Sequence, residues 1–188
     1  DCGIRSPKEA EHAREIGLDL IISDHHHPRD ELPNAFAVIC QKQEFDVYPN
    51  KQLAGVGLAF KIAQALVNDL KTTDIDIYRW LDLVALGTVA DIVPLVGENR
   101  ALVRAGLAQI RSGRRPGLFS LANISGVSIE KVTATDIGFM LGPRLNASGR
   151  MDTALESFNL LIARNMETAA PKALKLDEQN RDRQKLTQ

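Results

Sequence analysis

An apolar run over residues 18–23 ends in four consecutive acidic or imidazole side chains, Asp24, His25, His26 and His27. A short run of isoleucine and leucine of this length indicates a buried strand. Open α/β sheets bind their ligands at the carboxyl edge of the strands, which is where these four residues would lie. Carboxylate and imidazole groups together suit divalent metal ions. The run therefore predicts an α/β fold with a metal site, and a metal-assisted hydrolase.

The residues before this run predict a helix beside the strand. Ser6 is a candidate N-cap, Pro7 fits the first helical position, and Glu9 would close a capping box. Gly17 is expected to end the helix in the left-handed conformation. Because residues 1–4 have the pattern of a strand end, the order strand, helix, strand predicts parallel neighbours.

The rest of the chain is expected to be mostly helical, with one further strand over residues 35–40. The polar stretch from residue 166 predicts a solvated helix that begins at or kinks near Pro171. We therefore expect a parallel β-sheet flanked by helices, then a helical subdomain and a C-terminal linker helix. The other expected helices cover residues 53–70, 77–90, 99–111, 116–122, 135–145 and 153–164.

Composition excludes several classes of protein. With 188 residues, 44% hydrophobic and 25% charged, the chain is long enough for one well-buried domain, or for one domain with an appendage. A formal net charge of −1 means that a nucleic acid would have to be held by local basic patches. Cys2 and Cys40 give neither a metal-ligand spacing nor a disulfide framework, which favours the cytoplasm. The absence of a long apolar span argues against a membrane or secreted protein.

Three features are open to two interpretations from the residues alone. The histidine loop, residues 24–27, is either a ligand set or a solvent-exposed turn. Asp91, inside the apolar stretch 85–95, is either a helix-terminal cap or a metal ligand, and composition favours the cap. Gly55 and Gly57 precede a predicted helix, where glycines either approach a phosphate or allow close packing.

Residues 142–150 combine a predicted helix break with two arginines, Arg144 and Arg150. The planar guanidinium group suits bidentate contacts with phosphate oxygens. An ordinary surface loop is the commoner alternative. The same alternative, a solvated turn, is favoured for a second basic cluster, which consists of Arg111, Arg114 and Arg115.

Five segments, in this order and spacing, resemble the motifs of the DHH phosphoesterase superfamily. The last two segments resemble one branch of this superfamily, the single-stranded-DNA-specific exonucleases, more specifically than its other branches. The resemblance covers nearly the whole chain. The five segments are residues 1–4, 24–26, 53–57, 85–95 and 142–150.

Motif by motif, the resemblance implies the roles of the metal-site residues. Asp1 would bridge two metal ions, His25 would ligate one of them, and Asp91 would complete the shell of that ion. Asp24 would orient the imidazoles from outside the ligand shell. His26 would lie against the scissile phosphate, as a ligand or an electrostatic stabiliser.

The resemblance also implies a substrate and cofactors. Arg144 would grip a phosphate, and Asn146 and Arg150 would shape the same pocket. Two divalent cations, Mn²⁺ or Mg²⁺, would be needed. The expected activity is 5′-to-3′ hydrolysis of single-stranded DNA to mononucleotides, in DNA repair and recombination. A phosphodiesterase for short oligonucleotides or cyclic dinucleotides, and a non-catalytic scaffold, are the alternatives.

Two parts of the family pattern are not matched by these residues. They are the Asp-x-Asp-Gly motif after the first strand, which supplies ligands for the second metal, and the C-terminal DHH-associated domain. We therefore expect residues 1–165 to be a DHH domain without its first strand and first motif. Residues 166–188 would begin the long helix that connects the two domains. The second metal site is expected to be incomplete, and this chain to show little turnover alone.

Overall fold

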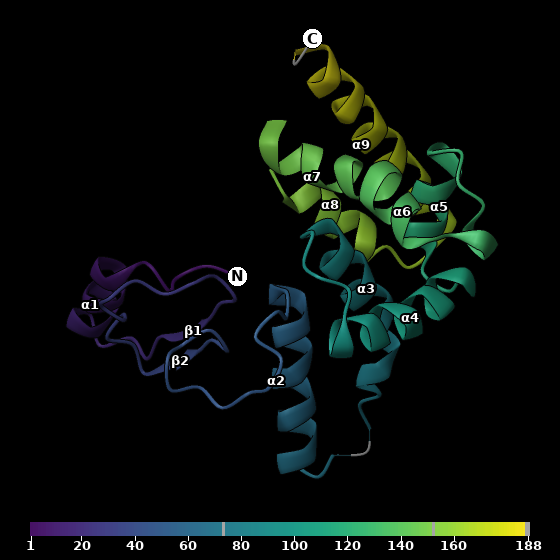
Figure 1. Ribbon diagram of the computed structural model, residues 1–188. Coiled ribbons are helices and arrows are strands. Elements are labelled where there is room, and N and C mark those ends of the chain that lie inside the picture. Colours follow the sequence, from purple (N-terminus) through teal and green to yellow (C-terminus); the bar gives the residue numbers. More distant parts are fainter. Residues whose placement is uncertain (73, 152, 187–188) are drawn as a thin grey trace. The chain divides into compact units, whose positions relative to one another are not determined.

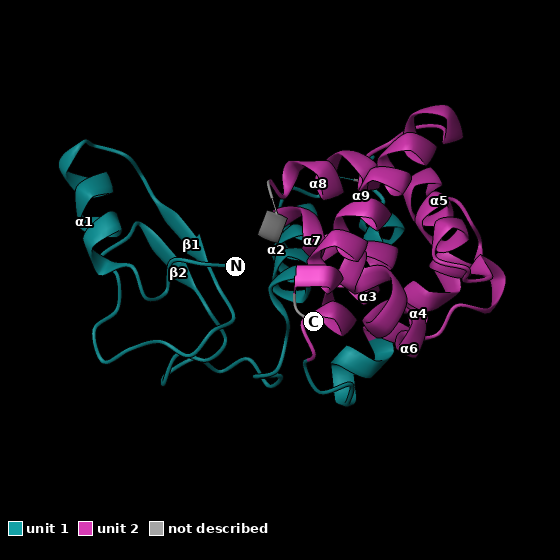
Figure 2. Cartoon of the chain, turned by 90° about the horizontal axis from the view of Figure 1, so that it is seen from above, with its two compact units in different colours: residues 1–80, 93–101 teal, residues 81–92, 102–188 magenta. Residues whose placement is uncertain are grey.

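The computed structural model describes residues 1–72, 74–151 and 153–186, without the side chains of Arg150 and Met151 (Figure 1). The chain divides into two compact units (Figure 2). Unit 1 comprises residues 1–80 and 93–101, and unit 2 comprises residues 81–92 and 102–188. Each unit is described by itself.

Unit 1 contains the sheet. Strands β1 (Ile21–Ser23) and β2 (Ala37–Ile39) are parallel, with Ile21 opposite Ala37. The sheet is parallel as expected, but the partner of β1 is β2 and not the segment of residues 1–4. The helical elements α1 (Pro7–Glu15), α2 (Gly55–Asp69) and η1 (Ile77–Trp80, a 3₁₀ turn) accompany them, together with the first turn of α4 (Gly97–Arg111).

Residues 1–4 do not form the strand predicted from the sequence. Gly3 has a φ of +112°, which a strand does not allow, and a Cβ there would lie 3.1 Å from Ile22. The N–H of Ile4 donates to Asp24 rather than to a neighbouring strand. This segment therefore crosses β1 at close range and belongs to the site described below.

The boundaries of α1 agree with the sequence analysis, but its predicted capping box does not form. Pro7 is the first helical residue, and Gly17 follows the helix with a φ of +73°. Ser6 is the N-cap residue, yet its side chain makes no capping hydrogen bond. Its backbone angles, φ −117° and ψ 60°, lie outside the extended region from which a hydroxyl reaches the first turn.

Unit 2 is a helical subdomain around one apolar core. The core includes Leu86 and Ile110, and the fully buried Leu121, Leu141 and Leu176. Helix α9 packs against α5, α7 and α8, so it closes the core of this unit. The helical elements are α3 (Leu81–Ala90), α4 (Gly97–Arg111, which begins in unit 1), α5 (Pro116–Ile124), η2 (Ile129–Lys131), α6 (Ala134–Asp136), η3 (Ile137–Leu141), α7 (Gly142–Met151), α8 (Leu155–Leu161) and α9 (Met166–Leu186).

The helix break predicted at residues 142–150 is wrong, because α7 is continuous there. The π-helical turn η3 precedes it and shifts the hydrogen-bond pattern just before Pro143, which lacks an N–H. Glycine is needed at residue 142, since a Cβ there would lie 2.9 Å from the carbonyl oxygen of Ile137. The helix expected over residues 77–90 is also divided, into η1 and α3.

Helix α9 begins at Met166, where the polar stretch starts, and runs through Pro171 instead of beginning there. Its buried residues recur at helical spacing and hold it against the other helices of unit 2. This packing outweighs the cost of the internal proline. The fold class is confirmed: a small parallel sheet with helices, followed by a helical subdomain and a C-terminal helix. The domain boundary at residue 166 stays a prediction.

Two arginines of the second basic cluster form hydrogen bonds that join separate segments of unit 2. Arg115 donates to both carboxylate oxygens of the buried Asp82, at 2.5 and 3.0 Å, and to the carbonyl of Leu161. Arg111 donates to the carbonyl of Val132 at 2.9 Å. These two side chains therefore do more than line a solvated turn.

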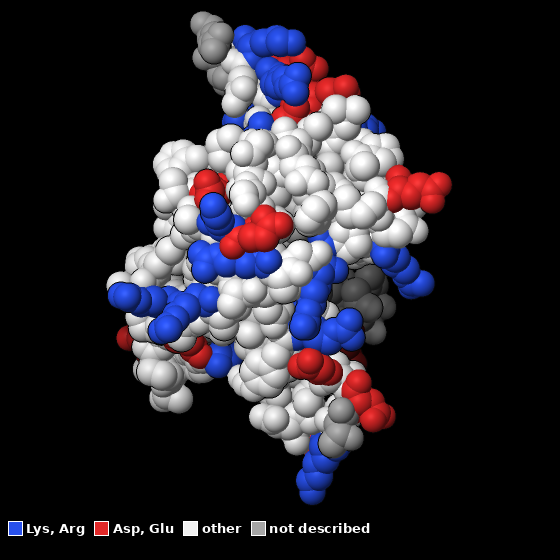
Figure 3. Space-filling model, turned by 90° about the vertical axis from the view of Figure 1, so that its right-hand side faces the viewer, with Lys and Arg blue, Asp and Glu red and all other residues white. Residues whose placement is uncertain are grey.

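Surface charge agrees with the low net charge. Figure 3 shows Lys and Arg side chains in several separate groups, with Asp and Glu between them on the same face. Within the described residues, every helix is too short or too polar to cross a lipid bilayer.

Candidate metal centre

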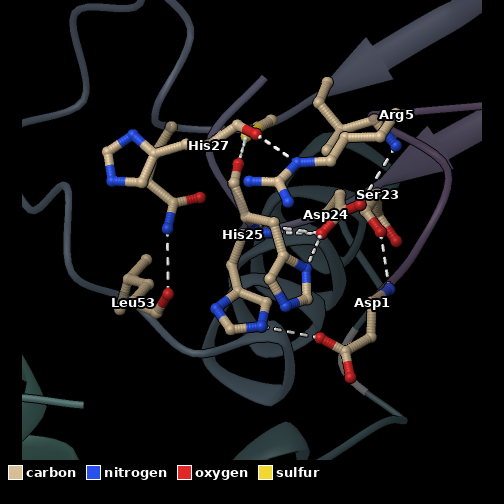
Figure 4. Close-up of polar contacts among 11 residues, drawn as sticks. Asp1, Arg5, Ser23, Asp24, His25, His27 and Leu53 are labelled. Atoms are coloured by element: carbon tan, nitrogen blue, oxygen red, sulfur yellow. Dashed lines mark hydrogen bonds and ion pairs between the residues drawn. The ribbon is translucent and has the colours of Figure 1, made fainter. Parts of the chain in front are cut away.

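Three side chains of unit 1 converge at the carboxyl end of β1. Asp1, His25 and His26 each offer a ligand atom, and these atoms all lie within 4.8 Å of one another. The N–H of Asp24 donates to the carbonyl of Ile39 at 3.0 Å, which fixes the start of the loop beside β2. The main-chain nitrogen of Asp1 donates to the carbonyl of Ser23 at 2.7 Å (Figure 4). The sheet edge predicted from the sequence is therefore the place where the ligand atoms meet.

Asp24 organises this loop from its buried position. One carboxylate oxygen accepts the N–H of Ile4 at 3.0 Å. The other accepts the N–H groups of His25 and His26, at 2.7 and 3.1 Å, and lies 2.7 Å from Nδ1 of the His26 ring. Burial raises the pKa of Asp24, but these hydrogen bonds outweigh it and lower the pKa to about 2. The carboxylate is therefore charged at neutral pH.

The charged Asp24 also sets the orientation of His26. A carboxylate against Nδ1 favours the tautomer with the proton on that atom, which leaves Nε2 able to accept a metal or a proton. The His26 side chain is 50% exposed, so its ring is held at one end and open at the other. A carboxylate behind a histidine is the arrangement found behind many metal-binding imidazoles.

His25 faces Asp1 directly, as Figure 4 shows. Its Nε2 lies 2.8 Å from a carboxylate oxygen of Asp1, and the His25 and His26 ring centres are 4.3 Å apart. The His25 side chain is 6% exposed and that of Asp1 74%. One carboxylate and two imidazoles, with one side open to solvent, form a donor set that fits a divalent cation.

Gly55 leaves the space that the Asp1 carboxylate occupies. A Cβ at Gly55, the first residue of α2, would overlap that carboxylate. The amino end of α2 also favours a negative group there. From the sequence, Gly55 was expected either to approach a phosphate or to allow close packing. In the structure it lies against Asp1, a candidate metal ligand.

Two residues to which the sequence analysis gave no role in the site fix the backbone of the loop. Arg5 donates through Nε to the carbonyl of His27 at 2.8 Å (Figure 4). Cys40, just after β2, donates through Sγ to the carbonyl of His26 at 3.4 Å. Neither residue belongs to a ligand pattern, so only the folded chain identifies them.

Asp91 lies in unit 2, directly after α3, and is exposed. A carboxylate at the carboxyl end of a helix is unfavourable for the helix dipole, so a capping role does not explain it. The next residue, Ile92, has a φ of +58° and is 90% exposed. A β-branched residue rarely adopts this conformation, and such strain is concentrated at functional sites. The role of Asp91 as a ligand stays a prediction.

The predicted phosphate contacts lie on α7 in unit 2. Arg144 donates through Nε to Asp177 at 2.8 Å and through Nη1 to the carbonyl of Met140 at 2.6 Å. Asn146 is exposed, and the side chain of Arg150 lies outside the described part of the structure. Their roles toward phosphate stay predictions.

Comparison with known proteins identifies relatives of the whole chain. Residues 1–88 match the model of the DHH family, N-terminal domain. The chain is 44% identical over 99% of its length to the single-stranded-DNA-specific exonuclease RecJ of Bacillus subtilis, and 41% identical over its whole length to that of Escherichia coli. It spans only 23% and 34% of these two relatives.

Solved structures show the same similarity. RecJ of Thermus thermophilus in complex with Mn²⁺ matches 99% of this chain with a TM-score of 0.87 and 34% identity, over 28% of that protein. An exonuclease RecJ bound to manganese matches 99% of the chain with a TM-score of 0.86 and 33% identity, over 46% of that protein.

Proposed function

This chain belongs to the DHH family, and from that premise we propose that it supplies the metal-binding groups of a single-stranded-DNA-specific exonuclease. The enzyme hydrolyses phosphodiester bonds from the 5′ end and acts in DNA repair and recombination in the cytoplasm. One observation carries the proposal: Asp1, His25 and His26 converge within 4.8 Å beside a buried carboxylate. The exonucleases to which the chain is similar support the substrate and the strand preference.

The metal ligands are Asp1, His25 and Asp91, and the cofactors are two divalent cations, Mn²⁺ or Mg²⁺. The mixed nitrogen and oxygen donors of the cluster suit Mn²⁺, and the relatives bound to Mn²⁺ support this choice. When bound, such ions lower the pKa of water and stabilise charge that develops on a phosphoryl group. Asp24 holds the histidine loop in place through its hydrogen bonds to the main chain.

His26 lies against the scissile phosphate, as a ligand or an electrostatic stabiliser. The charged Asp24 holds its Nδ1, and its side chain is 50% exposed, so Nε2 is left for a contact with metal or substrate. Arg144, Asn146 and Arg150 provide contacts to phosphate from α7. We assign residues 1–165 to the DHH domain and α9 to the start of a helix that connects it with a further domain.

The test measures release of nucleotides by the full-length protein that contains this chain. Single-stranded and duplex DNA, labelled at the 5′ end, are incubated with Mn²⁺ and the wild-type, His26→Ala or His27→Ala protein. We expect mononucleotides from the single strand only, and a loss of about 10²-fold or more in His26→Ala. His27→Ala is the matched control, because the contact of His27 with Arg5 uses its main-chain carbonyl, which alanine keeps.

Two results would contradict the proposal. Release limited to substrates of a few nucleotides would identify a short-oligonucleotide phosphodiesterase. No Mn²⁺-dependent release from any substrate would favour a non-catalytic scaffold.

A further inference from the structure

Asp177 of α9 is a fully buried carboxylate that binds two arginines. One oxygen accepts Nε of Arg144, from α7, at 2.8 Å. The other accepts Nη2 of Arg181, one turn later on α9. Two positive charges and one negative charge leave this cluster with a net charge of +1. The carboxylate is satisfied, and the excess charge is positive.

The contacts fix the two guanidinium groups differently. Arg144 is held along two edges, by Asp177 and by the carbonyl of Met140, and its side chain is only 14% exposed. Arg181 is held at one edge by Asp177, and its side chain is 62% exposed. The cluster therefore has a rigid inner guanidinium and an outer guanidinium that is anchored at one end and accessible to solvent.

We propose that Asp177 positions Arg144 and Arg181 as a paired site for one phosphate of a single-stranded DNA backbone. This inference rests on the proposed function, which supplies DNA as the ligand. Guanidinium groups bind phosphate oxygens through directed pairs of hydrogen bonds, and a preset orientation reduces the entropy lost on binding. The net charge of +1 matches the single negative charge of a phosphodiester. Asp177 is a positioning residue, and Arg181 is a binding residue.

The two arginines both pair with the buried Asp177, but they differ in which elements they join. The pair of Arg144 and Asp177 joins α7 to α9, so it stabilises the packing of unit 2. Arg181 lies on the same helix as Asp177 and joins no second element through this contact. Arg181→Gln therefore keeps the contact of Arg144 with Asp177 that joins α7 to α9, while it removes the outer positive charge.

The first experiment measures the affinity of full-length protein for fluorescein-labelled single-stranded DNA by anisotropy, without divalent cations, across a range of salt concentrations. The variants are Arg181→Gln and, as a matched control, Lys185→Gln. Lys185 is one turn further along α9, and its exposed side chain pairs with Asp182. For Arg181→Gln we expect a several-fold weaker Kd. The slope of log K against log salt should fall by about 0.7, the value for one phosphate contact on a single strand. Lys185→Gln should keep the wild-type slope.

The second experiment tests whether Asp177 acts through the arginines. Asp177→Asn, Arg144→Gln and the double variant are compared in the same assay, with Asp177→Glu as the conservative variant. We expect the double variant to be no weaker in binding than the weaker single variant, and Asp177→Glu to recover part of the affinity. Fully additive losses would overturn the positioning role. If Asp177→Asn does not fold, the Arg181→Gln result still decides the phosphate site.

The outcomes separate this inference from the proposed function. If wild-type protein binds and degrades single-stranded DNA but Arg181→Gln and Lys185→Gln have equal slopes, the inference fails and the function stands. If wild-type protein neither binds nor degrades single-stranded DNA, both fail.

Discussion

Asp24 illustrates how one buried side chain determines the positions of its neighbours. It accepts N–H groups from residues that precede and follow β1, so it joins Ile4 to the histidine loop. Removing a carboxylate that accepts several hydrogen bonds leaves buried donors unpaired, which costs more than the bonds contribute in net stability. The geometry of the candidate ligands therefore depends on a residue that need not touch the metal.

Gly55→Ala should reduce metal affinity without unfolding the protein. The new Cβ would overlap the Asp1 carboxylate, which must then move away from His25. Alanine itself is a better helix former than glycine, so α2 is not weakened. We expect a loss of about 10- to 100-fold in Mn²⁺ affinity, the usual range for groups that position metal ligands, measured by isothermal titration calorimetry.

Gly57→Ala is the control, since its Cβ would meet the side chain of Leu53, at 3.2 Å, and not a ligand candidate. Equal Mn²⁺ affinity in the Gly55→Ala and wild-type proteins would show that Asp1 is not a ligand in this position.

The elements of this fold differ in how far their sequences determine them. Helix α2 and strand β2 were predicted nearly in place, because apolar periodicity and flanking loops are local signals. Residues 142–150 were predicted wrongly, since their helix depends on the π-helical turn before Pro143 and on contact with α3. Likewise, the sequence located the histidine loop but not the carbonyl contact of Arg5, which only the folded chain forms.

A polar cluster joins three segments of unit 1 and predicts its response to acid. Glu98, in the first turn of α4, accepts the hydroxyl of Tyr48 at 2.9 Å and lies 2.6 Å from Nζ of Lys61 on α2. Burial raises the pKa of Glu98, but the hydrogen bonds from Lys61 and Tyr48 outweigh it, so the pKa is lowered from 4.5. A lowered folded-state pKa stabilises the fold above the unfolded-state value, and this contribution is lost as the pH falls through the folded-state value.

Glu98→Gln should therefore lower the free energy of unfolding at pH 7 by about 1–2 kcal/mol, because the charged hydrogen bonds are lost. The difference between wild type and variant should shrink as the pH falls below 4.5. Urea unfolding followed by circular dichroism at several pH values measures this. Glu31→Gln, on an exposed carboxylate of the same unit, is the control. A difference that is independent of pH would show that the charge of Glu98 does not contribute.

At the scale of the whole molecule, the candidate site residues are divided between the two units. Asp1, His25 and His26 belong to unit 1, whereas Asp91 and Arg144 belong to unit 2. The order of motifs along the sequence predicts that all of these residues take part in one reaction, because a family resemblance is recognised from the order of its motifs. Distances across the units depend on packing that no motif encodes.

The number of metal ions bound by this 188-residue chain tests whether one ion site or two can form from these residues. Among the residues that the structure describes, one cluster brings three ligand atoms together, which is sufficient for one ion. We therefore expect about one Mn²⁺ per chain in calorimetry, lost in Asp1→Asn. In Asp91→Asn the ion should bind more weakly if Asp91 completes its shell. Full-length protein should bind two ions and release nucleotides much faster than this chain. Equal stoichiometry and equal turnover would instead place every group that the reaction needs within these residues.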